Sequence, residues 1–303
     1  MYDLIVIGGG VAGMTAALYA LRGNKKVLII EKENYGGQIA KSPMVENYPT
    51  KKKISGSDLV DEMFDQIVDL GVVFELEDVE DITKNGNVFN VKTNYNQYEA
   101  MSVIIASGAQ PRKLNLEKED ELLGNGIYTC AICDGPLYAG KEVALVGDGN
   151  SAMQYALLLA QYCSKVTMVT MFDKFFGEKA LEDAIRVNEK IELIQNAVAN
   201  KLIGQEKLEA VEFKKSNGDT FVLNTNALFV AIGQVPNNNA FKNLVELDKF
   251  GYIVANETCL TKTEGLFVAG DCRTKVVRQV ATAIGDGATA GTQAVNYLNS
   301  LRV

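Results

Sequence analysis

The stretch LIVIGGGVAGMTAALYALRGNKKVLIIEKE, residues 4–33, decides the fold. An apolar run enters a glycine loop, a segment with helical spacing follows, and a second apolar run ends at Glu31. Gly8, Gly10 and Gly13 form GxGxxG, which permits a tight turn, close approach of a pyrophosphate, and close helix packing. The helix N-terminus attracts the anion, and a carboxylate at Glu31 accepts hydrogen bonds from ribose hydroxyls. The stretch predicts a dinucleotide-binding unit; the alternative is a glycine-rich turn without a ligand.

The same plan occurs a second time in the chain. EVALVGDGNSAMQYALLLAQYCSKVTMVTM, residues 142–171, again reads as strand, glycine loop, helix and strand. Another pair of similar segments follows, SVIIASGAQP at 102–111 and ALFVAIGQVP at 227–236, each an apolar strand that ends at a glycine and a proline. Two successive βαβ-type units are therefore predicted.

A third segment, GLFVAGDCRTKVVRQVATAIGDGATAG at 265–291, does not extend the second unit. It reads as a strand, a Gly-Asp turn and a helix of small residues that return to complete the first unit. We therefore expect an α/β fold with two Rossmann-like, three-layer domains, the second inserted in the first. The expected limits are 1–111 with 238–303 for a discontinuous first domain, and 112–237 for the inserted domain. The two crossings between them make a hinge possible.

Composition excludes several classes of function. The 303 residues include 30 basic and 38 acidic side chains, a formal net charge of −8, whereas nucleic-acid binding requires a basic face. Histidine is absent, which removes the commonest general base and metal ligand, so no metal site is expected. Residues 1–7 have no basic segment before them, and no run of about 18 apolar residues occurs. We expect a cytoplasmic protein without a signal peptide or membrane contact.

FAD, rather than NAD, is favoured by two further segments. YGGQIAKSPMVENYP, residues 35–49, is polar and rich in turns, and its Gln38 and Asn47 are suited to amide hydrogen bonds. The Gly270-Asp271 turn could place a carboxylate and a helix N-terminus on ribityl and pyrophosphate oxygens. Each segment alone is a weak signal, but together they predict a flavin site.

The motif YTCAICDGP, residues 128–136, holds Cys130 and Cys133 two residues apart. C-x-x-C in a cytosolic α/β protein predicts a redox pair. Zinc would need four ligands, and the chain has neither a second C-x-x-C nor a histidine; two buried thiols without function are the other alternative. Asp134 could carry protons as the sulfurs change charge.

The other three cysteines have no partner at short spacing. Cys163 ends an apolar helix, and Cys259 and Cys272 stand alone, with Cys272 next to the Gly-Asp turn. We expect all three to be structural, although Cys272 could lie near a flavin.

These motifs together resemble a known family. GGGVAG, Glu31, GGQ with ENYP, ASG, CAICD, GDGNSA and GDCRTKVVRQVATAIGDG occur in the order found in low-molecular-weight bacterial thioredoxin reductases, over nearly the whole chain. The resemblance implies a homodimer with FAD in the outer domain, a disulfide and NADPH in the inserted domain, and rotation of one domain against the other. It also implies that Cys133 faces the flavin, Cys130 attacks thioredoxin, and Asp134 is the acid.

The resemblance places Arg278, Gln279 and Val280 near the isoalloxazine. The complete set of expected FAD-binding residues is Gly8, Gly10, Val11, Ala12, Gly13, Glu31, Lys32, Gly37, Gln38, Asn47, Val79, Ala106, Ser107, Gly108, Gly270, Asp271, Arg278, Gln279 and Val280.

The chain departs from the family where NADPH would be recognised. Members that use NADPH carry His-Arg-Arg and a later Arg, and this sequence has Thr170, Met171, Phe172 and Phe176 at those positions, with Asp148 in the glycine loop. A hydrogen bond to a charged group contributes roughly 1.5–3 kcal/mol. Loss of two or three would weaken NADPH binding by about 5 kcal/mol, a factor of several thousand.

This departure resembles the clostridial, ferredoxin-dependent flavin thioredoxin reductases, in which reduced ferredoxin replaces NADPH. A flavin suits that task because it accepts one electron or two. Docking of ferredoxin on a chain of charge −8 requires a local basic patch. The candidates are Lys51, Lys52 and Lys53, for which a solvated loop is the alternative, and the pair Arg273 and Lys275.

Three other functions stay open. An NADPH-dependent thioredoxin reductase could hold the phosphate with Lys174 or Lys179. A diflavin disulfide oxidoreductase could place a second flavin nucleotide in the glycine loop beside Phe172 and Phe176. A non-catalytic FAD-binding redox sensor is disfavoured by the intact C-x-x-C-D motif.

Overall fold

The computed structural model describes residues 1–42, 45 and 47–301. The chain divides into two compact units, Met1–Gln110 with Val235–Val303, and Pro111–Gln234. The α/β class and the two Rossmann-like units, the second inserted in the first, are confirmed. The limits lie within three residues of those expected from the sequence.

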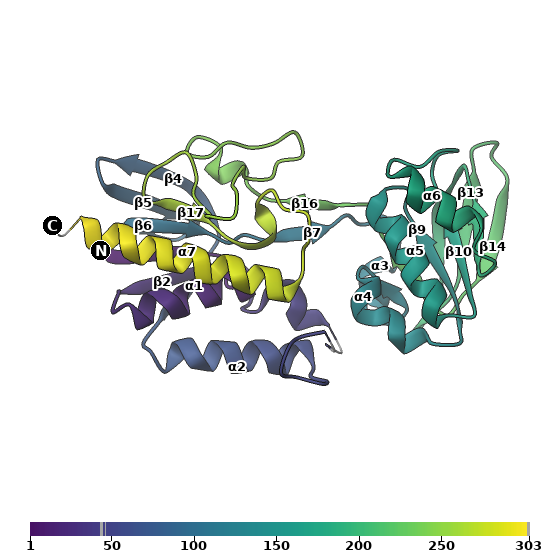
Figure 1. Ribbon diagram of the computed structural model, residues 1–303, viewed down its shortest axis with the longest axis horizontal. Coiled ribbons are helices and arrows are strands. Elements are labelled where there is room, and N and C mark those ends of the chain that lie inside the picture. Colours follow the sequence, from purple (N-terminus) through teal and green to yellow (C-terminus); the bar gives the residue numbers. More distant parts are fainter. Residues whose placement is uncertain (43–44, 46, 302–303) are drawn as a thin grey trace. The chain divides into compact units, whose positions relative to one another are not determined.

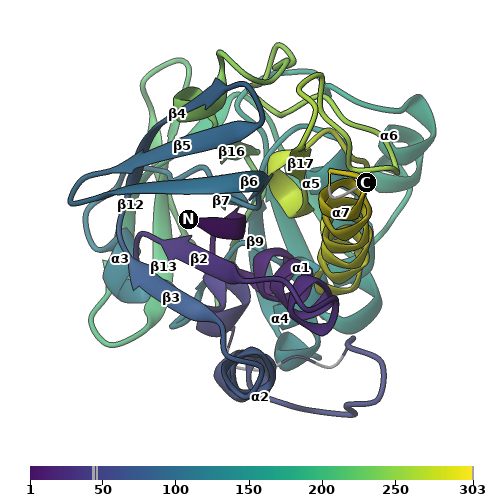
Figure 2. The ribbon, with the colours of Figure 1, turned by 90° about the vertical axis from the view of Figure 1, so that its left-hand side faces the viewer.

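The first unit is built on a seven-stranded sheet (Figures 1 and 2). The strands β3, β2, β1, β6 and β17 are parallel, and β5 and β4 continue the sheet in antiparallel order. One edge of β6 serves two neighbours, β5 at its start and β17 at its end. In spatial order the strands are β3 (Val73–Leu76), β2 (Val27–Glu31), β1 (Tyr2–Ile7), β6 (Gln97–Ile105), β5 (Val88–Thr93) and β4 (Val79–Asn85), with β17 (Leu266–Val268) beside β6.

Both faces of this sheet are buried, as the unbroken apolar run of β1 predicts. Leu4 joins a core with α1 (Val11–Arg22) and α7 (Val280–Ser300), whereas Ile5 faces the opposite core. The helices α1 and α7 lie side by side (Figure 1). A Cβ on Gly287 would come within 2.4 Å of the Ala12 carbonyl oxygen, so the small residues of α7 permit this close approach.

The helix α2 (Gly56–Val68) completes the helices of the first unit. Ser55 is its N-cap, and the Ser55 hydroxyl accepts a hydrogen bond of 3.0 Å from the Asp58 N–H. Its buried residues Val60 and Ile67 belong to the same core as α1.

The second unit repeats the parallel plan in a five-stranded sheet. One face packs on α5 and the other on an antiparallel three-stranded sheet, so the unit has three layers. The parallel strands in spatial order are β11 (Ile191–Ile194), β10 (Lys165–Val169), β9 (Glu142–Val146), β15 (Leu228–Val230) and β8 (Ile127–Tyr128). The antiparallel strands are β12 (Ala197–Gly204), β13 (Leu208–Lys215) and β14 (Thr220–Asn224), and the helices are α3 (Glu119–Leu122), α4 (Ala131–Asp134), α5 (Asn150–Tyr162) and α6 (Lys179–Arg186).

The chain crosses between the units twice, in β7 (Ala109–Pro111) and β16 (Gln234–Pro236), and these two strands pair with each other. Within the described ranges, none of the helices is long and apolar enough to cross a membrane.

Candidate active site

The first glycine loop connects β1 to α1 and leaves open space at the start of the helix. Gly8 has a φ of +106°, and a Cβ there would lie 2.3 Å from the Ala106 carbonyl oxygen, so only glycine fits. A Cβ on Gly10, the N-cap of α1, would meet nothing within 4 Å. The free N-terminus of α1 therefore has room for a phosphate group.

Glu31 has a role that the sequence did not predict. Its Oε2 accepts a hydrogen bond of 2.7 Å from the Gly9 N–H, and its Oε1 accepts one of 3.0 Å from the Glu33 N–H. The carboxylate thus holds the glycine loop, while an ionised carboxylate has further lone pairs for ribose hydroxyls. Gly37 lies against Gly10, since its Cβ would be 3.4 Å from the Gly10 Cα.

The Gly270-Asp271 turn lies against the start of α1, because a Cβ on Gly270 would be 2.8 Å from the Ala12 Cβ. The turn contains a buried acceptor: Asp271 Oδ1 has no hydrogen-bond partner among the described residues. Burial raises the pKa of Asp271, and the charge of Lys275 opposes that shift. A buried carboxylate oxygen that lacks a hydrogen bond calls for a donor, and a ribityl hydroxyl of FAD would fit this need.

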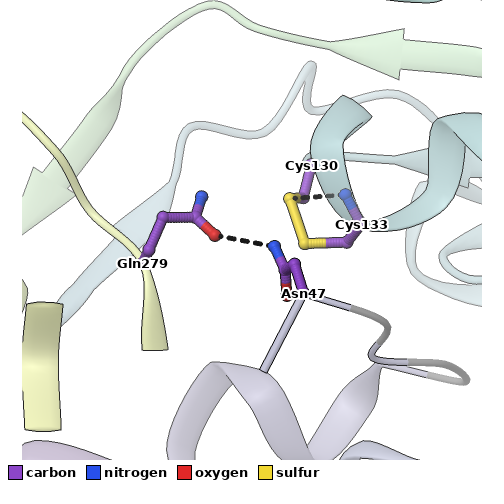
Figure 3. Close-up of a disulfide and its surroundings, with 4 residues drawn as sticks. All are labelled: Asn47, Cys130, Cys133 and Gln279. Atoms are coloured by element: carbon purple, nitrogen blue, oxygen red, sulfur yellow. Dashed lines mark hydrogen bonds between the residues drawn. A yellow bond between two sulfur atoms is a disulfide. The ribbon is translucent and has the colours of Figure 1, made fainter. Parts of the chain in front are cut away.

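A loop and the start of α7 meet at a hydrogen bond between amides. The Asn47 amide donates to the Gln279 Oε1 at 3.1 Å (Figure 3), and Gln279 is the N-cap of α7, directly before Val280. The Arg278 guanidinium lies 4.2 Å from the centre of the Tyr252 ring and donates to carbonyl oxygens of the preceding turn.

The remaining expected flavin residues have different surroundings. Lys32 and Gln38 are exposed, Val79 is half-buried at the start of β4, and Gly108 has open space at its Cβ position. Ser107 donates a 3.0 Å hydrogen bond to Asn238.

Sequence reasoning missed Asn238. Its side chain is 2% exposed and donates to the carbonyl oxygens of Gly251 and Cys272, both at 2.9 Å. Asn238 therefore links three segments of the first unit, those that contain Ser107, Gly251 and Cys272. The signal was weak, because residues 237–239 are all asparagine and nothing in the sequence distinguishes the middle one.

The cysteine pair lies at the start of α4 in the second unit and is closed as a disulfide (Figure 3). Both cysteines are half-buried, and their Cα atoms are 5.3 Å apart. The Cys133 N–H donates to the Cys130 sulfur at 3.2 Å, and such a donor stabilises a thiolate at Cys130. The expectation of a redox pair is thus supported by a formed and partly accessible bond.

Asp134, next to this disulfide, is placed to hold a proton. It is 6% exposed, and its Oδ1 has no partner in the part of the chain that the structure describes. Burial raises the pKa of Asp134 to about 7. The pKa values of Tyr138 and Tyr155 are also raised, chiefly by burial and in part by the charge of Asp134. The site can therefore exchange protons at neutral pH without a histidine.

The three other cysteines, Cys163, Cys259 and Cys272, are free and fully buried. Burial raises the pKa of Cys259 and of Cys272 to about 11, so neither is a thiolate at neutral pH. Over the residues that the structure describes, no group of three or more His, Cys, Asp or Glu side chains could hold a metal ion.

The second glycine loop, between β9 and α5, is bonded to a segment of its own unit. The Phe176 N–H donates to the Asp148 carbonyl oxygen at 2.8 Å, and the Glu178 N–H donates to the Asn150 Oδ1 at 2.8 Å. The rings of Phe172 and Phe176 meet edge to face at 5.3 Å. An exposed aromatic pair thus lies beside the loop.

The expected loss of cations at this loop can be followed residue by residue. Met171, Phe172 and Phe176 are 58%, 43% and 53% exposed, and Thr170 is buried with its hydroxyl bonded to the Phe172 carbonyl oxygen at 2.7 Å. Solvent-facing positions that could carry arginine therefore carry apolar side chains.

The two lysines that could replace the arginines have other contacts. The Lys174 ammonium lies 5.2 Å from the centre of the Phe176 ring. Lys179 pairs with Asp183 at 2.9 Å and with Glu182 at 3.5 Å, both on its own helix. The charge of Lys179 is thus shared with two carboxylates of its own helix.

The expectation that Arg273 and Lys275 form a docking patch is wrong. Both side chains are only 6% exposed, and both pair with Asp286, at 2.7 Å and 2.9 Å. A buried ion pair cannot present its charge to a partner. Of the other candidate patch, Lys51 pairs with Glu62 at 2.8 Å, whereas Lys52 and Lys53 are exposed.

Comparison with known proteins agrees with this geometry. The model of the family described as pyridine nucleotide-disulphide oxidoreductase matches residues 2–287. The thioredoxin reductase of Listeria monocytogenes is 37% identical over 304 residues, which cover 100% of this chain and 95% of that protein. A 34.2 kDa protein in the rubredoxin operon of Clostridium pasteurianum is 36% identical, with 98% of this chain and 97% of that protein covered.

Among solved structures, the thioredoxin reductase of Streptococcus pyogenes superimposes with a TM-score of 0.92 at 36% identity, covering 99% of each chain. The matches span both units, the glycine loops and the cysteine pair. This chain therefore belongs to the pyridine nucleotide-disulphide oxidoreductase family, as an FAD-dependent disulfide oxidoreductase of the low-molecular-weight thioredoxin reductase type.

Proposed function

We propose that this protein is a ferredoxin-dependent thioredoxin reductase, which passes electrons through FAD and the Cys130–Cys133 disulfide to thioredoxin. The observation that carries the proposal is the second glycine loop, where solvent-facing positions hold Met171, Phe172 and Phe176 instead of cations. A 2′-phosphate in that place would meet the exposed rings of Phe172 and Phe176. The specific recognition of NADPH needs the opposite, cationic hydrogen-bond donors.

The names of two relatives support the proposal from different sides. Relatives named thioredoxin reductase support thioredoxin as the substrate. The clostridial relative is named for a rubredoxin operon. The homodimer implied by the resemblance stays a prediction.

In the proposed mechanism the outer unit holds the flavin and the inserted unit holds the dithiol. Gly10 and the N-terminus of α1 would bind the pyrophosphate, Glu31 the ribose, and Asp271 a ribityl hydroxyl. Bound FAD supplies the conversion between single electrons and electron pairs. The residues of the first unit bind and orient it.

The dithiol half of the reaction can be written with balanced atoms. Two electrons and two protons convert the Cys130–Cys133 disulfide to two thiols. The Cys130 thiol loses its proton to solvent and attacks as a thiolate one sulfur of the thioredoxin disulfide, that bond breaks, and the departing sulfur takes the proton held at Asp134. Cys133 then gives its proton to Asp134 and attacks the Cys130 sulfur, which restores the protein disulfide, and the released second sulfur of thioredoxin takes a proton from solvent.

The test is to mix the oxidised protein anaerobically with reduced ferredoxin or, separately, with NADPH, and to monitor reduction of the flavin by its absorbance. Reduced ferredoxin should bleach the flavin, whereas NADPH should act no faster than NADH, because apolar side chains occupy the positions at which arginines would bind its 2′-phosphate. Rapid bleaching by NADPH alone would contradict the proposal and favour the NADPH-dependent alternative.

A gain-of-function variant sharpens this test. The triple change Met171→Arg, Phe172→Arg and Phe176→Arg restores cations at three exposed positions, and the preference for NADPH over NADH should rise by roughly tenfold or more, the value of one charged hydrogen bond. The matched control replaces the same three residues with glutamine, which should leave the preference unchanged.

The docking site of ferredoxin is proposed at Lys52 and Lys53, the exposed lysines of this run. Ferredoxins are acidic, so the double change Lys52→Glu and Lys53→Glu should slow flavin reduction by ferredoxin roughly tenfold at low ionic strength and flatten its salt dependence. Stopped-flow absorbance over a range of salt measures this. The control, Lys207→Glu with Lys214→Glu, alters the net charge equally at exposed positions of the other unit. Equal rates in the two variants would exclude the site.

One observation favours the diflavin function as a second candidate. The exposed edge-to-face pair of Phe172 and Phe176 lies beside the second glycine loop and could stack on an aromatic ring. Mass analysis of the flavin released per chain decides the matter: one FAD supports the ferredoxin-dependent enzyme, and a second flavin nucleotide supports the alternative.

A further inference from the structure

The helix α7 carries a buried carboxylate, Asp286, that the chemistry described so far does not use. It is 7% exposed and lies within the helix. The Arg273 guanidinium donates to both of its oxygens, from Nε to Oδ2 at 2.9 Å and from Nη2 to Oδ1 at 2.7 Å. Lys275 donates to Oδ2 at 2.9 Å. These three side chains form a largely buried ion cluster.

A fourth hydrogen bond to Asp286 comes from the backbone of the Gly270-Asp271 turn. The Gly270 N–H donates to Oδ2 at 3.0 Å. Gly270 has a φ of +82° and lies against Ala12 of α1. The carboxylate therefore holds the first residue of the turn that presents Asp271.

Lys275 links the cluster to Asp271, the residue of the turn that is expected to bind FAD. Its ammonium is 2.9 Å from Asp286 and 4.0 Å from the Asp271 Oδ1, the oxygen that has no hydrogen-bond partner within the described chain. One cation thus faces both carboxylates. Its charge favours the ionised form of Asp271, which accepts hydrogen bonds and donates none.

We propose that Asp286 is a positioning residue for FAD, which through Gly270, Arg273 and Lys275 keeps the turn in the conformation that offers the Asp271 carboxylate to a flavin hydroxyl. A buried ion cluster is a poor source of stability, since desolvation offsets the attraction. Its bidentate geometry instead specifies one arrangement of the turn. The inference rests on the FAD site and is independent of the electron donor.

The test is the retention of FAD by Asp286→Asn. An amide accepts at one oxygen only, so Arg273, Lys275 and the Gly270 N–H can no longer all be satisfied. On dilution of the holoenzyme, the flavin fluorescence should show a dissociation constant raised roughly 10- to 100-fold, the range of one charge-assisted hydrogen bond. Hydrogen exchange at the Gly270 amide should also accelerate, which a loss of general stability would not confine to this turn.

The matched control is Glu119→Gln in the other unit. Glu119 is also 7% exposed, and its carboxylate accepts from the N–H groups of Leu114, Asn115 and Leu116. This variant loses a buried carboxylate of the same kind and should keep the wild-type affinity for FAD. Similar loss of FAD in both variants would overturn the proposal.

A double-mutant cycle with Asp271→Asn separates positioning from an independent effect. If Asp286 acts through Asp271, the double variant should lose little more affinity than Asp271→Asn alone. Multiplicative losses, or an Asp286→Asn affinity within about twofold of wild type, would overturn the assignment.

If Asp286→Asn does not fold, the charge-balanced variant Arg273→Gln with Asp286→Asn replaces it. That variant removes one buried charge of each sign and leaves Lys275 facing Asp271. The loss of one charged hydrogen bond should raise the dissociation constant of FAD by roughly tenfold or more, and that result supports the positioning role. A dissociation constant equal to that of the wild type contradicts it.

Discussion

Replacing Cys133 with serine should abolish turnover of thioredoxin while leaving the flavin reducible by its donor. The disulfide joins residues whose Cα atoms are 5.3 Å apart, and a serine oxygen cannot close it again. Each turnover requires a thiol to expel the bound partner, so the reaction should stop after one attack. Steady-state reduction of thioredoxin, measured beside anaerobic bleaching of the flavin, checks both halves.

The same variant assigns the two sulfurs. With Cys133 replaced, Cys130 should attack a single-cysteine thioredoxin whose sulfur is already joined to thionitrobenzoate, expel the thionitrobenzoate thiolate and form a stable mixed disulfide that is visible by mass analysis. Cys130→Ser is the matched control and should form no such complex, because the attacking sulfur is missing. Trapping by Cys130→Ser instead would reverse the roles of the two cysteines.

Asp134→Asn should lower thioredoxin turnover by about 10²- to 10⁴-fold, the usual contribution of a general acid. Burial raises the pKa of Asp134 to about 7, so its proton is present below pH 7 and lost above it. Wild-type turnover should therefore fall as the pH rises through about 7, and the residual rate of the variant should lack this step. A variant that keeps the same pH profile would show that another group supplies the proton.

The stability of the second unit gives an independent check of that pKa. The folded-state pKa of Asp134 lies above its ordinary value of 3.8, so the neutral form is favoured by folding. This contribution is complete below about pH 4 and is lost as the pH rises through about 7, a span of at most about 4 kcal/mol. Asp134→Asn, which stays neutral, should therefore unfold at a higher temperature than wild type at pH 8 and at a similar one at pH 4. No gain at pH 8 would contradict the raised pKa.

Local patterns determined much of the fold. The apolar runs, glycine loops and helical spacing of residues 4–33 and 142–171 predicted two βαβ units, and the structure has strands and helices at those places. Such patterns succeed because a parallel strand buried on both faces must be apolar throughout, and a glycine is required where Gly8 passes the Ala106 carbonyl oxygen. The cysteine pair was equally local, since four consecutive residues suffice to form its disulfide.

The sequence alone gave a wrong prediction for the exposure of charged side chains. Arg273 and Lys275 lie two residues apart, and their sequence predicts an exposed basic patch. In the structure both side chains are buried and pair with Asp286 of α7. Lys51 is likewise paired with Glu62 of α2. The sequence shows which side chains carry charge, but not which of them face solvent, because that depends on helices packed from distant parts of the chain.

By itself, then, the sequence determined the α/β class, the two glycine loops, the closely spaced cysteine pair and the missing arginines, all of which depend on short-range spacing. Only the tertiary structure decided the surroundings of the acids: the burial of Asp134, the Asp271 oxygen that has no hydrogen-bond partner in the described ranges, and the ion cluster at Asp286. The physical reason is that the pKa and the availability of a carboxylate depend on burial and on facing charges, and those are contributed by residues far away in the chain.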